Sequence, residues 1–313
     1  MAHKSGGDLH FVLTLYFIIM ENLLSSIENG ASHIEALKSK VFVAKKIQLH
    51  TGLEGFNSPE AFGVYKNTGG SALGVVGKVY EPTDLHLFLD AIHHSVLNSG
   101  IDLDITKLEY KEYYGGSKVS FVLPFKKYEI ESPMVGDTLA TKLCFGTGFD
   151  GKTKAYVNFS AFRLWCSNGA KGWQKDIDLS MKNTLSNQAK LLYFTNEVIK
   201  AAEGVDKYVG FLNNSVVKNV KQSDIDTFLT ALTGYNVKEY NDLTTRKRNI
   251  LDSINRAIVT EIQNTGANYF SLLQGITRYT THDLAKGDEE ALLFAHASQM
   301  SDKAHQLIFA ELN

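Results

Sequence analysis

Lysine and tyrosine residues interleave along two stretches of the sequence, and this pattern offers the clearest chemistry in the chain. The first stretch covers residues 107–128 and the second covers residues 142–171. Proteins that hold single-stranded nucleic acid set cations against the phosphates and aromatic rings against the bases. We therefore predict a nucleic-acid surface with phosphate-binding cations and stacking tyrosines: Lys78, Lys126, Lys127, Lys142, Lys154, Arg163, Arg278, Tyr113, Tyr114 and Tyr156.

A solvated sheet face is the competing interpretation of the same residues. Four glutamates lie among the cations and would offset their charge, namely Glu109, Glu112, Glu129 and Glu131. Composition alone favours this second interpretation, because charged side chains are mostly found on ordinary protein surfaces.

Several histidines on one predicted helix form a candidate metal site. The spacing of His86, Asp90, His93 and His94 could bring two or three of them near one ion. The fuller ligand set of a metal site does not occur nearby in the sequence, and a solvated helix face has the same pattern. We therefore predict no metal.

Three glycines, Gly146, Gly148 and Gly151, match the spacing of a dinucleotide-binding loop. Such a loop requires a strand before it and a helix after it, because the helix N-terminus must face the pyrophosphate. An extended segment follows here instead. The sequence therefore predicts a hairpin turn, and we predict no cofactor.

A thiol nucleophile is a further candidate, with Cys166 attacking, His282 as its base and Asp283 orienting the imidazole. Such arrangements are assembled in space and cannot be derived from spacing. Cysteines in strands are usually small buried hydrophobic residues. We assign no catalytic residue, and the sequence favours a protein that is not an enzyme.

The segment from Leu139 to Trp173 must position many of these residues. It is predicted to form two strands joined at Asp150-Gly151, a dipeptide that favours hairpin turns because both positions tolerate positive φ. Alternation places six residues on one face of the second strand: Ala155, Val157, Phe159, Ala161, Arg163 and Trp165. An arginine on that apolar face is either a buried, paired charge or a group that faces a groove.

The remaining elements are predicted from periodicity and turn residues. A second hairpin turns at Gly115-Gly116, and a helix that opens near Pro82 has an apolar stripe of Leu85, Phe88, Leu89, Ile92 and Val96. Helices are predicted over residues 182–202, 222–232, 244–263, 268–284 and 288–312. Strands followed by helices indicate an α+β fold. We divide the chain into an N-terminal extension and helix (1–40), a mainly antiparallel sheet with one helix (41–174), and a helical region packed on the sheet (175–313).

Composition and charge limit the classes of protein that fit. Lysine and arginine number 32 against 34 acidic residues, which argues against a generally basic nucleic-acid binder but allows a local basic surface. With two cysteines, Cys144 and Cys166, reduced thiols are expected. The apolar run at residues 9–20 is shorter than the roughly 20 residues of a membrane helix. This run fits either translation starting at Met20 or packing on a partner, so we expect a cytoplasmic protein without membrane association.

Three motifs occur in an order that resembles a known family. The first is residues 68–82 (TGGSALGVVGKVYEP) before a helix, and the second is residues 163–168 (RLWCSN). The third is residues 277–282 (TRYTTH), which follow the aromatic pair at residues 269–270. Together they resemble the phage/plasmid-like proteins of domain of unknown function 932. The chain departs from the family pattern at residues 267–269, where Ala-Asn-Tyr replaces Thr-Ala-Trp, and around Gly169.

The resemblance implies a protein of a phage or other mobile element. It implies binding or annealing of single-stranded DNA during replication or recombination, as a homo-oligomer in the host cytoplasm. It also implies a signature of Cys166, Asn168, Gly169, Thr277 and His282. The alternative is a non-enzymatic phage structural or interaction protein whose helical half binds a protein partner.

Overall fold

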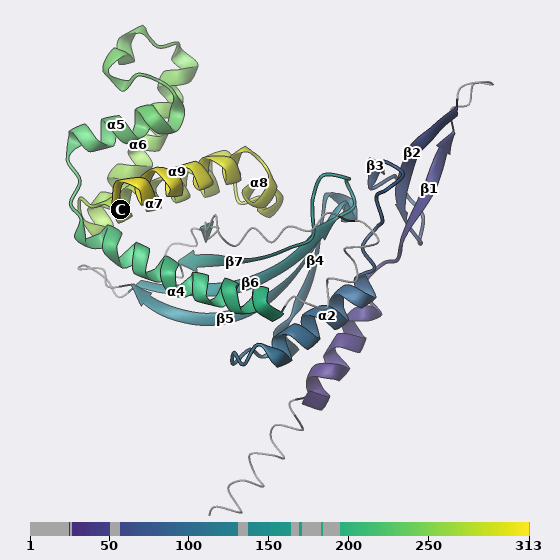
Figure 1. Cartoon of the computed structure of the whole chain (residues 1–313). Helices are drawn as coiled ribbons and strands as arrows, with labels where there is room; N and C mark the ends of the chain where they lie inside the picture. Colours follow the sequence, from purple (N-terminus) through teal and green to yellow (C-terminus); the bar gives the residue numbers. More distant parts are fainter. Residues whose placement is uncertain are drawn as a thin grey trace, which may run out of the picture.

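The computed structural model describes residues 25, 27–50, 57–130, 137–163, 169–170, 183 and 195–312. The N-terminal half of the chain forms two antiparallel sheets, and a helix lies between their strands in the sequence. A set of helices follows (Figure 1). The predicted α+β class is confirmed. No helix within the described ranges combines the length and the hydropathy needed to cross a bilayer.

The smaller sheet has three strands in the order β1 (Ala44–His50), β2 (Asn57–Lys66) and β3 (Gly74–Val76). A helix over residues 27–38 precedes it. Gly69 and Gly70 lie between β2 and β3 and adopt φ values of 89° and 106°, which only glycine takes readily. In Figure 1 this sheet projects away from the rest of the molecule.

The larger sheet has five strands in sequence order: β4 (Glu109–Tyr113), β5 (Lys118–Ile130), β6 (Asp137–Gly148), β7 (Tyr156–Arg163) and β8 (Gly169–Ala170). Before β4 lies the short helix η1 (Ile105–Lys107), and the turn into β5 is η2 (Tyr114–Gly116). Both predicted hairpins are confirmed, β4 with β5 and β6 with β7. Gly151, at φ 74°, provides the left-handed position in the β6–β7 turn.

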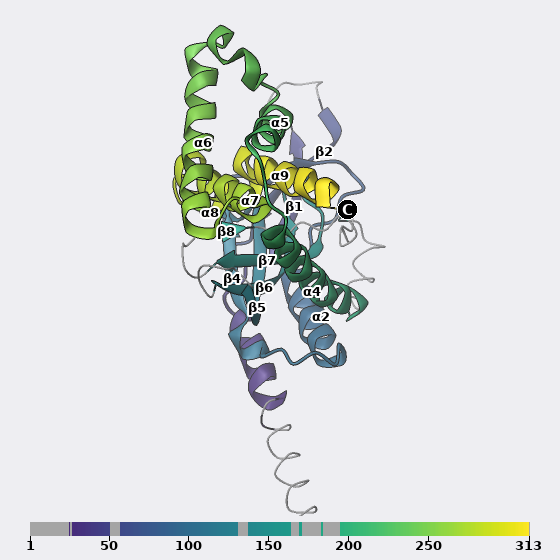
Figure 2. The ribbon, with the colours of Figure 1, turned by 90° about the vertical axis from the view of Figure 1, so that its left-hand side faces the viewer.

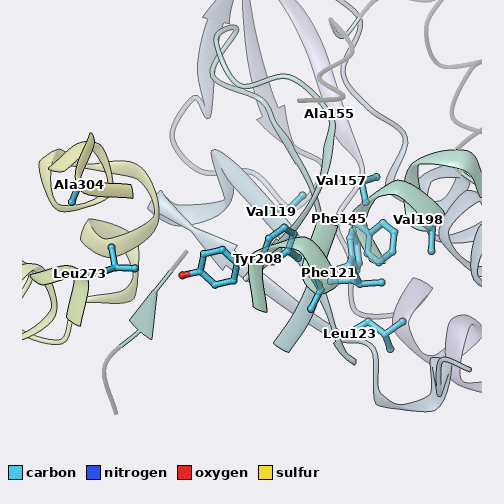
Figure 3. Close-up of a cluster of buried hydrophobic side chains, with 14 of the residues drawn as sticks. Val119, Phe121, Leu123, Phe145, Ala155, Val157, Val198, Tyr208, Leu273 and Ala304 are labelled. Carbon is cyan, nitrogen blue, oxygen red and sulfur yellow. The ribbon is translucent and has the colours of Figure 1, made fainter. Parts of the chain in front are cut away.

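Two helices cover one face of the larger sheet and build the core with it. Helix α2 (Leu85–Asn98) begins at Asp84, whose carboxylate accepts hydrogen bonds from two backbone N–H groups of the first turn. All five residues of its predicted apolar stripe are buried. Helix α4 (Thr195–Val217) lies beside α2 (Figure 2). Phe88 of α2 meets Phe121 with ring centroids 5.8 Å apart, and Tyr208 of α4 meets Phe159 at 5.6 Å. Phe121 and Tyr208 are among the buried side chains labelled in Figure 3.

The helical region continues with α5 (Gln222–Thr233), η5 (Val237–Asp242), α6 (Thr245–Thr265), α7 (Tyr269–Arg278), η6 (Tyr279–Leu284), α8 (Glu289–Phe294) and α9 (His296–Leu312). The prediction of one helix over residues 288–312 is wrong. Ala295 adopts extended backbone angles and separates α8 from α9. Periodicity did not show this break, because both halves are apolar enough to continue one pattern. Helix α4 runs to Val217, well past the predicted end at Ala202.

Candidate nucleic-acid interface

The register of the larger sheet separates an apolar face from a polar face. Directly opposed residues of antiparallel strands point to the same side. Phe121 therefore shares a face with Phe145 and Val157, and all three are buried against the helices. The adjacent residues point to the opposite face, which carries lysine, tyrosine, serine and asparagine side chains together with Glu109 and Val122. We call this second side the polar face: Lys111, Tyr113, Lys118, Ser120, Lys142, Cys144, Tyr156 and Asn158.

Several of the predicted residues are brought together on the polar face. Lys142, Tyr113 and Tyr156 all lie on it, although they come from three different strands. Lys118 pairs with Gly148 at one end of β6, and Lys142 lies six residues earlier on that strand. At about 3.3 Å per residue, the cations therefore extend over roughly 20 Å along the strands. Each of the three lysines of this face is partly buried.

Tyr156 is held against the sheet by a glycine on the neighbouring strand. Its partner in the register is Gly146, and a side chain there would overlap the Tyr156 ring, since a Cβ would lie 2.3 Å from the ring carbon Cζ. The absent side chain lets the ring lie flat across β6. Burial raises the pKa of the Tyr156 hydroxyl, and a hydrogen bond with Ser120 opposes this effect. The ring is therefore a fixed, neutral part of the polar face.

Tyr113 and Tyr114 both pack against one phenylalanine from a distant helix. Phe294 of α8 meets Tyr113 at 5.2 Å between centroids, edge to face, and meets Tyr114 at 6.0 Å. The Lys118 ammonium lies 4.3 Å from the centre of the Phe294 ring. Glu290 accepts a hydrogen bond from the Tyr114 backbone N–H at 2.6 Å. Tyr113 is 4% exposed in this arrangement, so in this conformation its ring contacts α8 rather than solvent.

Lys118 also connects the polar face to the β6–β7 turn. Its ammonium lies 3.9 Å from the Asp150 carboxylate. That carboxylate accepts hydrogen bonds from the N–H groups of Lys152 and Thr153 and from the Thr153 hydroxyl, at 2.7–2.9 Å. Burial opposes its ionisation, but these hydrogen bonds and Lys118 outweigh burial and lower the pKa of Asp150. The single acid of this turn is thus directed inward.

A pocket of about 480 Å³ lies beside this turn, where the two sheets meet. It is lined by Val75, Val76, Gly77, Val79, Tyr80, Asp150, Gly151, Lys152, Thr153, Lys154 and Asn183. Lys78 lies between two of these lining residues and is exposed, as are Lys152 and Lys154. Of the predicted cations, the structure therefore brings Lys78 and Lys154 to one rim. We call this place the junction pocket.

Three other predicted cations lie at the far end of the larger sheet. Lys126 and Lys127 are exposed and follow a bulge in β5, where Thr141 exchanges hydrogen bonds with the Lys126 backbone at 2.8 and 3.2 Å. Arg163 ends β7 opposite Leu139, and its side chain lies outside the described residues. This group is therefore separated from the junction pocket by most of the length of β6.

Arg278 lies in the helical region, apart from both groups. Its guanidinium is 3.5 Å from the carboxylate of Glu261, whose side chain is fully buried between α6 and α7. Burying a carboxylate away from water costs free energy unless a cation or hydrogen bonds compensate its charge. At the end of α7, Arg278 thus compensates the charge of the buried Glu261 carboxylate.

The signature residues are distributed over three places. Thr277 is buried, and its hydroxyl donates to the Leu273 carbonyl oxygen one turn earlier at 2.9 Å. His282 is exposed within the π-helix η6, and Gly169 begins β8. Cys166 and Asn168 lie outside the described residues, so the proposed thiol site does too. Among the described residues, no group of three potential ligands could hold a metal ion, and Asp90 pairs with Lys38 at 2.6 Å.

Two important residues of this region were not singled out from the sequence. Asn183 donates to the Gly148 carbonyl oxygen at 2.8 Å and closes the floor of the junction pocket. Phe294 covers the two tyrosines from a helix nearly two hundred residues further along the chain. No local pattern marks either residue, because each acts through a contact that is distant in sequence.

Comparison with protein-family models, with curated proteins and with solved structures finds no match to this chain. The resemblance to a phage/plasmid-like family therefore stays a prediction.

Proposed function

We propose that this chain binds single-stranded nucleic acid along the polar face of its larger sheet and at the rim of the junction pocket. The observation that supports this most directly is the distribution of cations. One face of the sheet is apolar and covered by α2 and α4, whereas the other carries three lysines and leads through Lys118 to the pocket rim. Phosphate groups are the ligands that such a row of cations favours.

The setting of this activity rests on the sequence resemblance. We propose replication or recombination of a phage or other mobile element, in the cytoplasm of its host, with annealing of strands as the associated activity. The binding chemistry itself depends only on the lysines and rings described above.

Salt dependence of binding tests this proposal. For single strands, the logarithm of the binding constant falls with the logarithm of salt concentration by about 0.7 for each phosphate neutralised. We expect a steep slope for a (dT) oligonucleotide measured by fluorescence anisotropy between low and physiological salt. A flat response, or no binding at low salt, would contradict the proposal.

A protein partner is the second candidate, favoured by strand β1. This strand is at one edge of the three-stranded sheet in the part of the chain that the structure describes, and its Ile47 is 52% exposed. Edge strands can pair with a strand of another chain, including a second copy. Size analysis at micromolar concentration, with and without single-stranded DNA, separates the two candidates. Assembly that does not depend on DNA would favour the protein partner.

A further inference from the structure

The junction pocket has the dimensions of a small-ligand site. Its volume of about 480 Å³ falls inside the range of roughly 300–1,000 Å³ typical of such sites. It is formed by the turn after β3 and the β6–β7 turn, two segments more than seventy residues apart. Since neither turn forms the pocket alone, its shape depends on how the two sheets meet.

The walls of the pocket are unusually apolar for an exposed part of the chain. Val75 is 62% exposed and Val79 is 81% exposed, the two highest values for valines that line this site. Gly77 between them adds no side chain, and a Cβ built on it would meet no atom within 4 Å. A flat apolar group could therefore contact the valines and the bare backbone together.

The rim of the pocket is positively charged. Lys78 and Lys152 form no ion pair with any described residue and are exposed on the two turns, and Lys154 lies close by. The one carboxylate of the lining, Asp150, is already engaged by its own turn and by Lys118. Apolar walls below the exposed ammonium groups of Lys78 and Lys152 match a ligand that has a flat apolar part and an anionic part.

A hydrogen-bond network fixes the floor of the pocket. The Tyr80 hydroxyl donates to the Gly148 carbonyl oxygen at 2.7 Å, and the Asn183 amide donates to the same oxygen at 2.8 Å. The side-chain oxygen Oδ1 of Asn183 accepts a hydrogen bond from the Thr83 hydroxyl at 3.3 Å. Burial raises the pKa of Tyr80 to about 12, so its hydroxyl stays neutral and does not repel an anion. A site that is ordered before binding loses less conformational entropy when the ligand enters.

We propose that the junction pocket accepts one unstacked base of a single strand, with the adjoining phosphate held by Lys78 and Lys152. The base lies against Val75, Val79 and the backbone at Gly77. This inference rests on the proposed function and adds that binding depends on the bases as well as on the phosphates.

The test compares a (dT) oligonucleotide with an abasic oligonucleotide of the same length. We expect wild-type protein to bind the (dT) strand roughly tenfold more tightly, because one well-placed base contributes about that factor. Gly77→Leu adds a bulky side chain among the residues that line the pocket, and position 77 has neither a positive φ nor a neighbour that a Cβ would strike. We expect it to reduce the (dT)-to-abasic ratio by about threefold or more while the affinity for the abasic strand is unchanged.

A matched control uses Gly210→Leu on the exposed side of α4, where a Cβ also meets no atom within 4 Å. This variant should keep the wild-type ratio. Val79→Ser serves as a second variant that removes apolar wall from a side chain already 81% exposed, so folding is preserved. It should lower the ratio as well.

The outcomes distinguish failure of the base site from failure of the proposed binding of single strands. Equal affinity of wild-type protein for both strands would overturn the base site and leave phosphate binding intact. An unchanged ratio in folded Gly77→Leu and Val79→Ser would also overturn it. Failure of wild-type protein to bind either strand at low salt would instead overturn the proposed function, and the base site with it.

Discussion

Lysine side chains are exposed at the junction pocket, whereas several polar side chains in the helical region are buried and paired. At the pocket, Lys78 and Lys152 extend into solvent, and the apolar valines beside them are exposed as well. In the helical region, Glu261 and His305 are 0% and 1% exposed and have partners inside the protein. Exposed charges that form no ion pair with a described residue are available to a ligand, whereas buried and paired groups chiefly affect stability. Substitutions in the two regions should therefore separate binding from folding.

The largest effect is expected from His305 in α9. Its Nδ1 lies 2.8 Å from the Ser301 carbonyl oxygen, which can only accept, so Nδ1 carries the proton. Its Nε2 then accepts a hydrogen bond from the Tyr208 hydroxyl at 2.9 Å. The neutral imidazole is thus specified by both contacts, and burial lowers its pKa to about 4.

This pKa makes stability depend on pH in a defined direction. Unfolded chains bind a proton at His305 below about pH 6.5, whereas the folded protein binds it only below about pH 4. The contribution of the neutral His305 imidazole to the free energy of unfolding is therefore complete above pH 6.5. It is lost as the pH falls from 6.5 to 4, and the free energy of unfolding decreases by about 3 kcal/mol. Urea unfolding of wild-type protein and His305→Gln across this range measures it.

His296→Gln is the matched control for this titration, because His296 is exposed at the start of the same helix. It should retain the wild-type pH dependence, whereas His305→Gln should lose this part of it. Identical curves for wild-type protein and His305→Gln would show that the imidazole is not held neutral.

Arg278 tests whether the helical region affects stability alone, because this residue was predicted to bind phosphate but lies in that region. Arg278→Gln leaves the buried Glu261 carboxylate without its guanidinium, and we expect a loss of about 2 kcal/mol in the free energy of unfolding. Binding of single strands should change little. Arg256→Gln, an exposed change on the same helix as Glu261, should alter stability by less than about 0.5 kcal/mol. Weaker binding by Arg278→Gln at unchanged stability would place Arg278 in the interface.

The sequence predicted the sheet and much of the helical region because their patterns are local. Alternation at Ala155, Val157 and Phe159 identified the buried face, and Asp150-Gly151 identified the turn. The break at Ala295 was missed, since no Gly or Pro marks it in the sequence.

The candidate site was only partly predictable. Of the predicted residues, Tyr113, Lys142 and Tyr156 lie on the polar face. Lys78 and Lys154 were also named, but their proximity was not predicted. Whether a cation is free or paired is decided by residues far away in sequence, as Glu261 shows for Arg278. The junction pocket needs Asn183 and two distant turns to be placed together, and no periodicity encodes that arrangement.

The smallest effect is expected from Lys78 and Lys152 at the pocket rim, and it concerns binding alone. The double variant Lys78→Gln and Lys152→Gln removes two exposed ammonium groups that have no ion pair among the described residues. If each neutralises one phosphate, the log–log salt slope should become shallower by about 1.4, and the free energy of unfolding should stay within about 0.5 kcal/mol.

A control with the same net charge separates a local contact from a general charge effect. Lys207→Gln with Lys238→Gln changes two exposed lysines on α4 and η5, away from the residues that line the pocket. An equal change of slope in both double variants would mean that overall charge, and not the pocket rim, attracts the strand. A change confined to Lys78 and Lys152 would tie the phosphate contacts to the region whose charges are exposed, because only there do the substituted ammonium groups flank a pocket.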